Sequence, residues 1–90
     1  MSEERKNRIT VEILGQQYVI IGKESPNHIR HVATTVDEKM KEIRNKNTFL
    51  DTNQLAVLTA VNAVNEYIKL KEKYDRLQER LNQLESDTNQ

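Results

Sequence analysis

The spacing of apolar residues changes from a period of two to spacings of three and four along this 90-residue chain. Near the N-terminus the period is two, the spacing of a strand with one buried face. One face would carry Ile9, Val11 and Ile13, and the other would carry Thr10, Glu12 and Leu14. Gly15, Gln16 and Gln17 interrupt this run, and β-branched and aromatic residues resume over 18–22. Two short strands around a glycine-bearing turn predict a β-hairpin over 9–22, which must pack on another element or another copy because a lone hairpin is marginal in water.

The next segment has the features of an amphipathic helix over 26–44. Ser25 can cap free backbone N–H groups, and Pro26 suits the first helical position because it lacks an N–H that would be unsatisfied anyway. Apolar residues then recur at spacings of three and four and form one stripe. They are Ile29, Val32, Ala33, Val36, Met40 and Ile43. The opposite face is charged, so this helix buries one face only.

A polar break over 45–50 separates this helix from a much longer helical segment. Asp51 or Thr52 caps the second helix, and Gln54 is placed to return the hydrogen bond to Asp51, as in a capping box. From there no Pro or Gly occurs through Gln90. A helix over about 52–85 would be roughly 50 Å long at 1.5 Å per residue. That is far longer than a globule of this size needs.

The long helix carries two apolar stripes. The valine stripe consists of Val57, Val61, Val64 and Ile68. The seam consists of Ala60, Ala63, Tyr67, Leu70, Tyr74, Leu77, Leu81 and Leu84. We expect the valine stripe to face the hairpin and first helix of the same chain, and the seam to form a coiled coil with another chain. Arg80 would face Glu85 across a parallel pair, which favours that orientation slightly, since exposed pairs contribute only about 0 to 1 kcal/mol.

Together these elements predict an α+β fold. An N-terminal β-hairpin and an amphipathic helix form a small head, and one long C-terminal helix follows and forms a coiled coil with another chain. We expect a disordered tail at 1–8 and a globular head at 9–66, with the hairpin at 9–22, the first helix at 26–44 and the start of the long helix at 52–66. The coiled-coil dimerisation segment then covers 67–85, and a second disordered tail covers 86–90.

Composition favours an oligomer. The chain is 36% hydrophobic and contains no cysteine and two histidines, so its marginal core has no disulfide and no structural metal to supplement it. Fourteen basic and fourteen acidic residues give a formal net charge of zero, which provides no overall attraction to nucleic acid or to an anionic membrane. The polar N-terminus does not resemble a signal peptide, and no apolar run approaches a membrane span of about 20 residues. We therefore expect a cytoplasmic protein.

The sequence offers little catalytic chemistry. It has no cysteine, no glycine-rich phosphate loop and no paired acid and base beyond those of any charged helix surface. Ser25 and His28 could be drawn as nucleophile and base, but Ser before Pro is better explained as a helix cap. His28 and His31 lie one helical turn apart and lack a third metal ligand. We expect no enzymatic activity, no metal and no cofactor.

Positive charge is concentrated near the end of the first helix, at Lys39, Lys41, Arg44 and Lys46. These cations can simply interact with the helix C-terminus. Alternatively, they form a docking patch for an acidic partner beside the exposed break over 45–50. A nucleic-acid-binding surface is a third interpretation, which zero net charge and the lack of interleaved aromatic residues disfavour.

The ordered set of features resembles the ZapA family of bacterial cell-division proteins. The segments that carry the resemblance are VEILG at 11–15, the proline-started helix, and DTNQLAVLTAVNAVNEY at 51–67. It covers about residues 8 to 85. The resemblance implies a homodimer with two heads side by side, which in some members joins tail to tail as an antiparallel dimer of dimers, a homotetramer. It also implies a non-catalytic protein at mid-cell that binds the tubulin-like GTPase FtsZ, crosslinks and bundles its protofilaments, and promotes assembly and stability of the division (Z) ring.

The family's partner-binding surface maps by position to Gln16, Arg44, Lys46 and Asn53 of this chain. Gln16 and Asn53 are uncharged, whereas basic or acidic residues are common at these positions in longer relatives, so Arg44 and Lys46 are the stronger candidates. Two functions of other classes stay open. One is a dimeric nucleic-acid-binding module that uses the patch from Lys39 to Lys46. The other is a generic adaptor whose coiled coil recruits a different helix.

Overall fold

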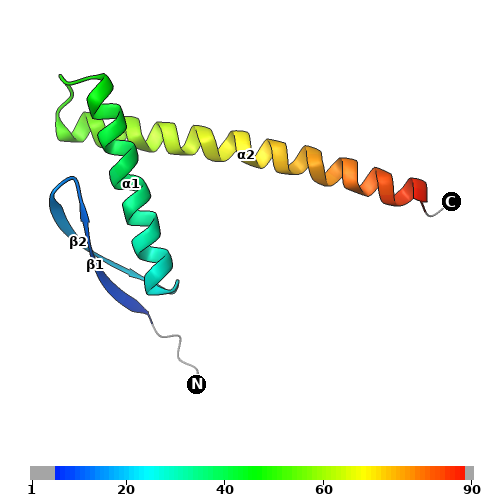
Figure 1. Cartoon of the computed structure of the whole chain (residues 1–90), viewed down its shortest axis with the longest axis horizontal. Helices are drawn as coiled ribbons and strands as arrows, with labels where there is room; N and C mark the ends of the chain where they lie inside the picture. Colours follow the sequence, from blue (N-terminus) through cyan, green and yellow to red (C-terminus); the bar gives the residue numbers. More distant parts are fainter. Residues whose placement is uncertain (1–5, 89–90) are drawn as a thin grey trace. The chain divides into compact units, whose positions relative to one another are not determined.

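The structure, a computed structural model, describes residues 6–88. Four elements follow one another along the chain: β1 (Asn7–Ile13), β2 (Gln16–Gly22), α1 (Pro26–Lys46) and α2 (Thr52–Thr88). Figure 1 shows the hairpin lying along α1. The predicted α+β fold, with a hairpin, a short helix and one long helix, is confirmed.

The hairpin closes with a tight two-residue turn. The strands pair antiparallel with Ile13 opposite Gln16, so only Leu14 and Gly15 form the loop. Both have positive φ, 52° for Leu14 and 76° for Gly15, as in the type I′ turns that match the twist of paired strands. Glycine adopts this conformation freely, whereas a left-handed leucine costs on the order of 1 kcal/mol. The sequence predicted that residues 15–17 separate the two strands. Instead Gln16 and Gln17 belong to β2, because the turn consists of Leu14 and Gly15.

Three element ends differ from the expected ones. β1 begins at Asn7, inside the expected tail at 1–8, because Asn7 pairs with Gly22 and its Nδ2 donates to the Glu24 carbonyl at 2.6 Å. The first helix continues to Lys46 instead of residue 44. α2 continues to Thr88, past the expected end near 85, since no Gly or Pro stops it. Residues 1–5 and 89–90 of the expected tails lie outside the described residues.

The predicted helix caps are present. The Ser25 side chain accepts a hydrogen bond from the backbone N of His28 at 3.2 Å. Asp51 and Gln54 form the reciprocal capping box: Asp51 N donates to Gln54 Oε1 at 3.1 Å, and Gln54 N donates to Asp51 Oδ1 at 2.8 Å. These bonds satisfy backbone donors that have no partner within the helix, and they define where each helix begins.

The hydrophobic core is small and lies between the hairpin and α1. Val11, Ile29 and Ala33 form its centre, and three partly buried side chains of the hairpin pack against them. Those three are Ile9, Ile13 and Ile20. Among the described residues, none has a completely enclosed side chain. A core of this size contributes little stability, which agrees with the expectation from chain length and composition.

The chain divides into two compact units, Met1–Thr59 and Ala60–Gln90. The first unit, called the head below, contains the hairpin, α1 and the first turns of α2; the second contains the rest of α2. The division falls at residue 59, whereas the sequence predicted a boundary at residue 66. Within the head, Leu55 and Thr59 are the buried residues of α2.

The valine stripe is exposed, with exposures from 48% at Ile68 to 61% at Val57. Val57, the one stripe residue inside the head, does not pack against the hairpin or the first helix as predicted. The physical reason is that α1 and the hairpin cover each other's apolar faces, while α2 buries a different side through Leu55 and Thr59. The large side chains of the seam, from Tyr67 to Leu84, are 49–66% exposed as well.

Candidate interaction site

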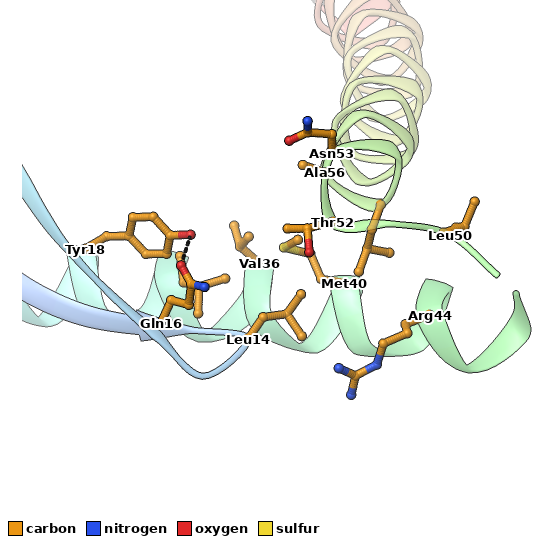
Figure 2. Close-up of a pocket in the computed structure, with 12 residues that line it drawn as sticks. Leu14, Gln16, Tyr18, Val36, Met40, Arg44, Leu50, Thr52, Asn53 and Ala56 are labelled. Carbon is orange, nitrogen blue, oxygen red and sulfur yellow. Dashed lines mark hydrogen bonds between the residues drawn. The ribbon is translucent and has the colours of Figure 1, made fainter. Parts of the chain in front are cut away.

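A groove of about 450 Å³ in the head is formed by the hairpin turn, α1 and the start of α2. In Figure 2, Gln16 and Tyr18 stand on the hairpin side, Met40 and Arg44 on α1, and Asn53 on α2. We call it the head groove. Its walls are mostly apolar, from side chains that include Leu14, Val36, Leu50 and Leu55. Its volume lies within the range of about 300–1,000 Å³ that ligand sites occupy in proteins.

The structure brings three of the four candidate partner-binding residues together. Gln16, Arg44 and Asn53 all line the head groove, although they come from three elements and are separated by up to 37 positions along the chain. Lys46 does not line it. Two residues beyond Arg44 on α1, Lys46 lies about 200° further around the helix axis.

The head groove combines apolar walls with one positive charge. Among residues 6–88, Arg44 is the only charged residue that lines it. Gln16 Oε1 accepts a hydrogen bond from the Tyr18 hydroxyl at 3.4 Å, so the amide nitrogen of Gln16 is available as a donor (Figure 2). A guanidinium group presents paired N–H donors that match a carboxylate. The groove therefore suits an acidic partner better than a basic one.

The positive patch predicted at Lys39, Lys41, Arg44 and Lys46 is not one continuous surface. Lys39 and Lys41 line a separate hollow together with Glu38 and Glu42. Lys41 Nζ lies 3.0 Å from Asp37 Oδ2 and forms an ion pair with it. Two acidic residues beside the lysines and one directly paired with Lys41 weaken the local field that a phosphate backbone requires.

Asp37 holds the hairpin turn against α1. Its Oδ1 accepts a hydrogen bond from the Leu14 backbone N at 2.8 Å, and its other oxygen pairs with Lys41. The hydrogen bond from Leu14 and then the bond from Lys41 lower the pKa of the Asp37 carboxyl below its ordinary value, while burial opposes the shift. The bond fixes the left-handed Leu14, whose side chain lines the head groove. Sequence reasoning missed this contact, because it treated the polar face of this helix only as a charged surface. The available signal was a leucine before the turn glycine.

The histidines do not assemble a metal site. Among residues 6–88, no three His, Cys, Asp or Glu side chains lie close enough together to hold an ion. His28 and His31 are exposed, and the Ser25 oxygen already accepts the capping bond from His28 N. The same part of the chain contains no helix with the length and hydropathy needed to span a membrane.

Comparison with known proteins gives consistent matches over nearly the whole chain. The family described as "Cell division protein ZapA" matches residues 9–90. The ZapA of Geobacillus sp. (strain WCH70) is 60% identical over 81 residues, which cover 90% of this chain and 93% of that protein. The ZapA of Bacillus pumilus is 56% identical over 85 residues, with 94% and 100% coverage. A solved structure, a ZapA mutant dimer from Geobacillus stearothermophilus, is 56% identical with a TM-score of 0.73, and the match covers 90% of this chain and 94% of that one.

Proposed function

We propose a function from the premise that this chain belongs to the ZapA family of cell division proteins. It is a non-enzymatic FtsZ-binding protein that crosslinks and bundles FtsZ protofilaments. In this role it promotes assembly and stability of the division ring, in the cytoplasm at mid-cell. The observation that carries the proposal is the combination of a mostly apolar groove with one cation on the head and an exposed apolar seam on α2. Such a chain needs a second copy, and two joined copies present two heads.

The exposed seam supports self-association. Its six large side chains, from Tyr67 to Leu84, are 49–66% exposed in the single chain. A row of exposed large apolar residues marks an interaction surface. We propose a homodimer in which the two seams pack as a coiled coil.

We propose Arg44 as the centre of the FtsZ-binding surface, with Gln16 and Asn53 beside it in the head groove. Lys46 contributes from outside the groove as a second cation. The arrangement is suited to an acidic segment of FtsZ, since Arg44 is the only charged lining residue. Linking two such heads raises the effective affinity for a polymer without any new contact, because the second binding event becomes intramolecular.

Co-sedimentation with FtsZ polymers tests the proposal. We expect the wild-type protein to pellet with the polymers and to thicken them in electron micrographs. Arg44→Glu combined with Lys46→Glu should reduce pelleting strongly while leaving the mass of the dimer unchanged. Arg30→Glu is the control: it reverses one charge, as each of the two substitutions does, on an exposed arginine of α1 that does not line the head groove.

Two outcomes would count against the proposal. If neither protein changes the sedimentation of the other at low salt, FtsZ is not the partner. If the double variant pellets as well as the Arg30 control, FtsZ binding remains but its site lies elsewhere on the molecule.

A further inference from the structure

Phe49 is the most exposed large apolar side chain among residues 6–88. It lies in the loop between α1 and α2 and is 95% exposed in the single chain, whereas the next most exposed, Leu70, is at 66%. A single apolar residue on a surface is ordinary, so its exposure alone assigns no role. Phenylalanine is nevertheless among the residue types most often buried, and one side chain can bury about 150–250 Å². A partner that covers Phe49 therefore gains a large apolar contact from one side chain.

The loop that carries Phe49 is hydrogen-bonded at both of its ends. At the end of α1, the backbone N of Asn47 donates to the carbonyl oxygens of Ile43 and Arg44 at 3.1 and 3.2 Å. The backbone N of Phe49 itself donates to Asn47 Oδ1 at 3.4 Å. At the other end, the capping box described above fixes the start of α2. Because the loop is ordered before any partner binds, a contact through Phe49 loses less conformational entropy than one through a loop that orders on binding.

Phe49 adjoins the residues proposed to bind FtsZ. Its neighbour in the chain, Leu50, lines the head groove together with Arg44 (Figure 2). Arg44 and Lys46 are the basic residues in the last turn of α1. From position 44 to position 51 the chain carries these two cations and one carboxylate, that of Asp51, which accepts the capping bond at the start of α2. An aromatic side chain, an apolar groove and a local excess of positive charge therefore meet at the same end of α1.

We infer that Phe49 is an anchor that inserts into an apolar pocket rimmed by carboxylates on the FtsZ polymer; this inference rests on the proposed function. The pocket covers the ring, and its carboxylates pair with Arg44 and Lys46. Aromatic residues and arginine are enriched at the centres of protein interfaces, where a few side chains carry most of the binding energy. A second copy is the poorer occupant, because its own head groove carries Arg44 and would repel the cations beside Phe49.

Titration with assembled FtsZ polymers, read by co-sedimentation, tests the anchor. We expect Phe49→Ala to raise the apparent dissociation constant about tenfold or more. Phe49→Leu should raise it less, because leucine retains much of the apolar area. Thr48→Ala is the control: it truncates the adjacent exposed side chain of the same loop and should leave the constant unchanged. Because Phe49 is 95% exposed, its truncation removes no buried contact from the head. Equal binding by Phe49→Ala and the wild type would overturn the inference.

Salt dependence separates the ring from the cations. Salt screens exposed charge pairs and leaves apolar contacts largely intact. The ratio of the dissociation constants of Phe49→Ala and the wild type should therefore be the same at low and high salt, whereas the ratio for Arg44→Glu should fall as salt is added. A ratio for Phe49→Ala that falls in parallel with that for Arg44→Glu would overturn the inference, because the loss would then be electrostatic.

The mass in solution, measured without FtsZ, assigns the surface that covers Phe49. Phe49→Ala should have the same mass as the wild type at every concentration, because the inference assigns the ring to FtsZ and not to a second copy. A lower mass for Phe49→Ala would assign the ring to self-association and overturn the inference. The proposed function fails separately: wild-type protein that does not pellet with FtsZ contradicts it, whereas wild-type pelleting with no loss in Phe49→Ala contradicts only the anchor.

Discussion

Removing two leucines from the seam should separate the copies while the core of the head remains intact. Leu77 and Leu81 belong to the second unit, whereas the core residues Val11 and Ile29 belong to the first. We expect Leu77→Ala combined with Leu81→Ala to act almost entirely on association. Gln78→Ala with Asn82→Ala is the matched control, because it truncates the neighbouring side chains outside the seam.

The structure sets the size of the effect. Truncation of a buried leucine costs about 2 to 5 kcal/mol, but Leu77 and Leu81 are 57% and 49% exposed in the single chain, so association buries about half of each. We therefore expect about 1 to 2 kcal/mol for each leucine. A dimer contains four of them, so the total is about 4 to 8 kcal/mol, at least about a thousandfold in the dissociation constant.

Light scattering across a range of concentrations measures this change. The wild type and the control should keep the mass of an oligomer at micromolar concentration, and the double variant should fall towards the monomer mass. The amide resonance of Leu14, which is hydrogen-bonded to Asp37 in the head, reports whether the hairpin turn persists. An unchanged mass for the double variant would refute the seam. A monomer mass for the wild type would refute self-association altogether.

Three further predictions concern stability. The pKa of Asp37 is lowered in the folded state. Its carboxylate therefore stabilises the fold at pH values above the ordinary pKa, and this contribution is lost as the pH falls below about 4. Asp37→Asn should lower the melting temperature at pH 7 and have less effect at pH 3. Gly15→Ala should cost about 1 kcal/mol in chemical denaturation through its positive φ alone, since no atom beyond the adjacent residues lies within 4 Å of the added Cβ; no loss would argue against the type I′ turn. Asp51→Ala removes the capping box with Gln54 and should lower the free energy of unfolding by about 0.5–2 kcal/mol. An unchanged free energy of unfolding would show that the cap is dispensable.

Much of the fold follows from local sequence signals. Period-two alternation predicts the hairpin, Ser25 with Pro26 predicts the start of α1, and the pair of Asp51 and Gln54 predicts the start of α2. Each signal depends on residues one to four positions apart, whose geometry in a strand or helix is fixed by the backbone. Element ends were less predictable, because Asn7 enters β1 through pairing with a strand that comes later in the chain.

The candidate site could be predicted only in part. The resemblance supplied Gln16, Arg44 and Asn53 as separate positions, and the structure places all three around one groove. Asp37, which holds the turn residue Leu14, was not predicted, because a hydrogen bond between residues 23 positions apart leaves no periodic trace in the sequence.

By itself, the sequence determines that α2 carries two apolar stripes and that a chain of this size needs a partner. Only the tertiary structure shows which residues of α2 are buried within the head. Helical periodicity shows which residues share a face of the helix, but it does not show which of those faces is buried. Within the head, α2 buries Leu55 and Thr59 and leaves Val57 61% exposed. We propose that a second copy covers the surplus of apolar residues in the long helix.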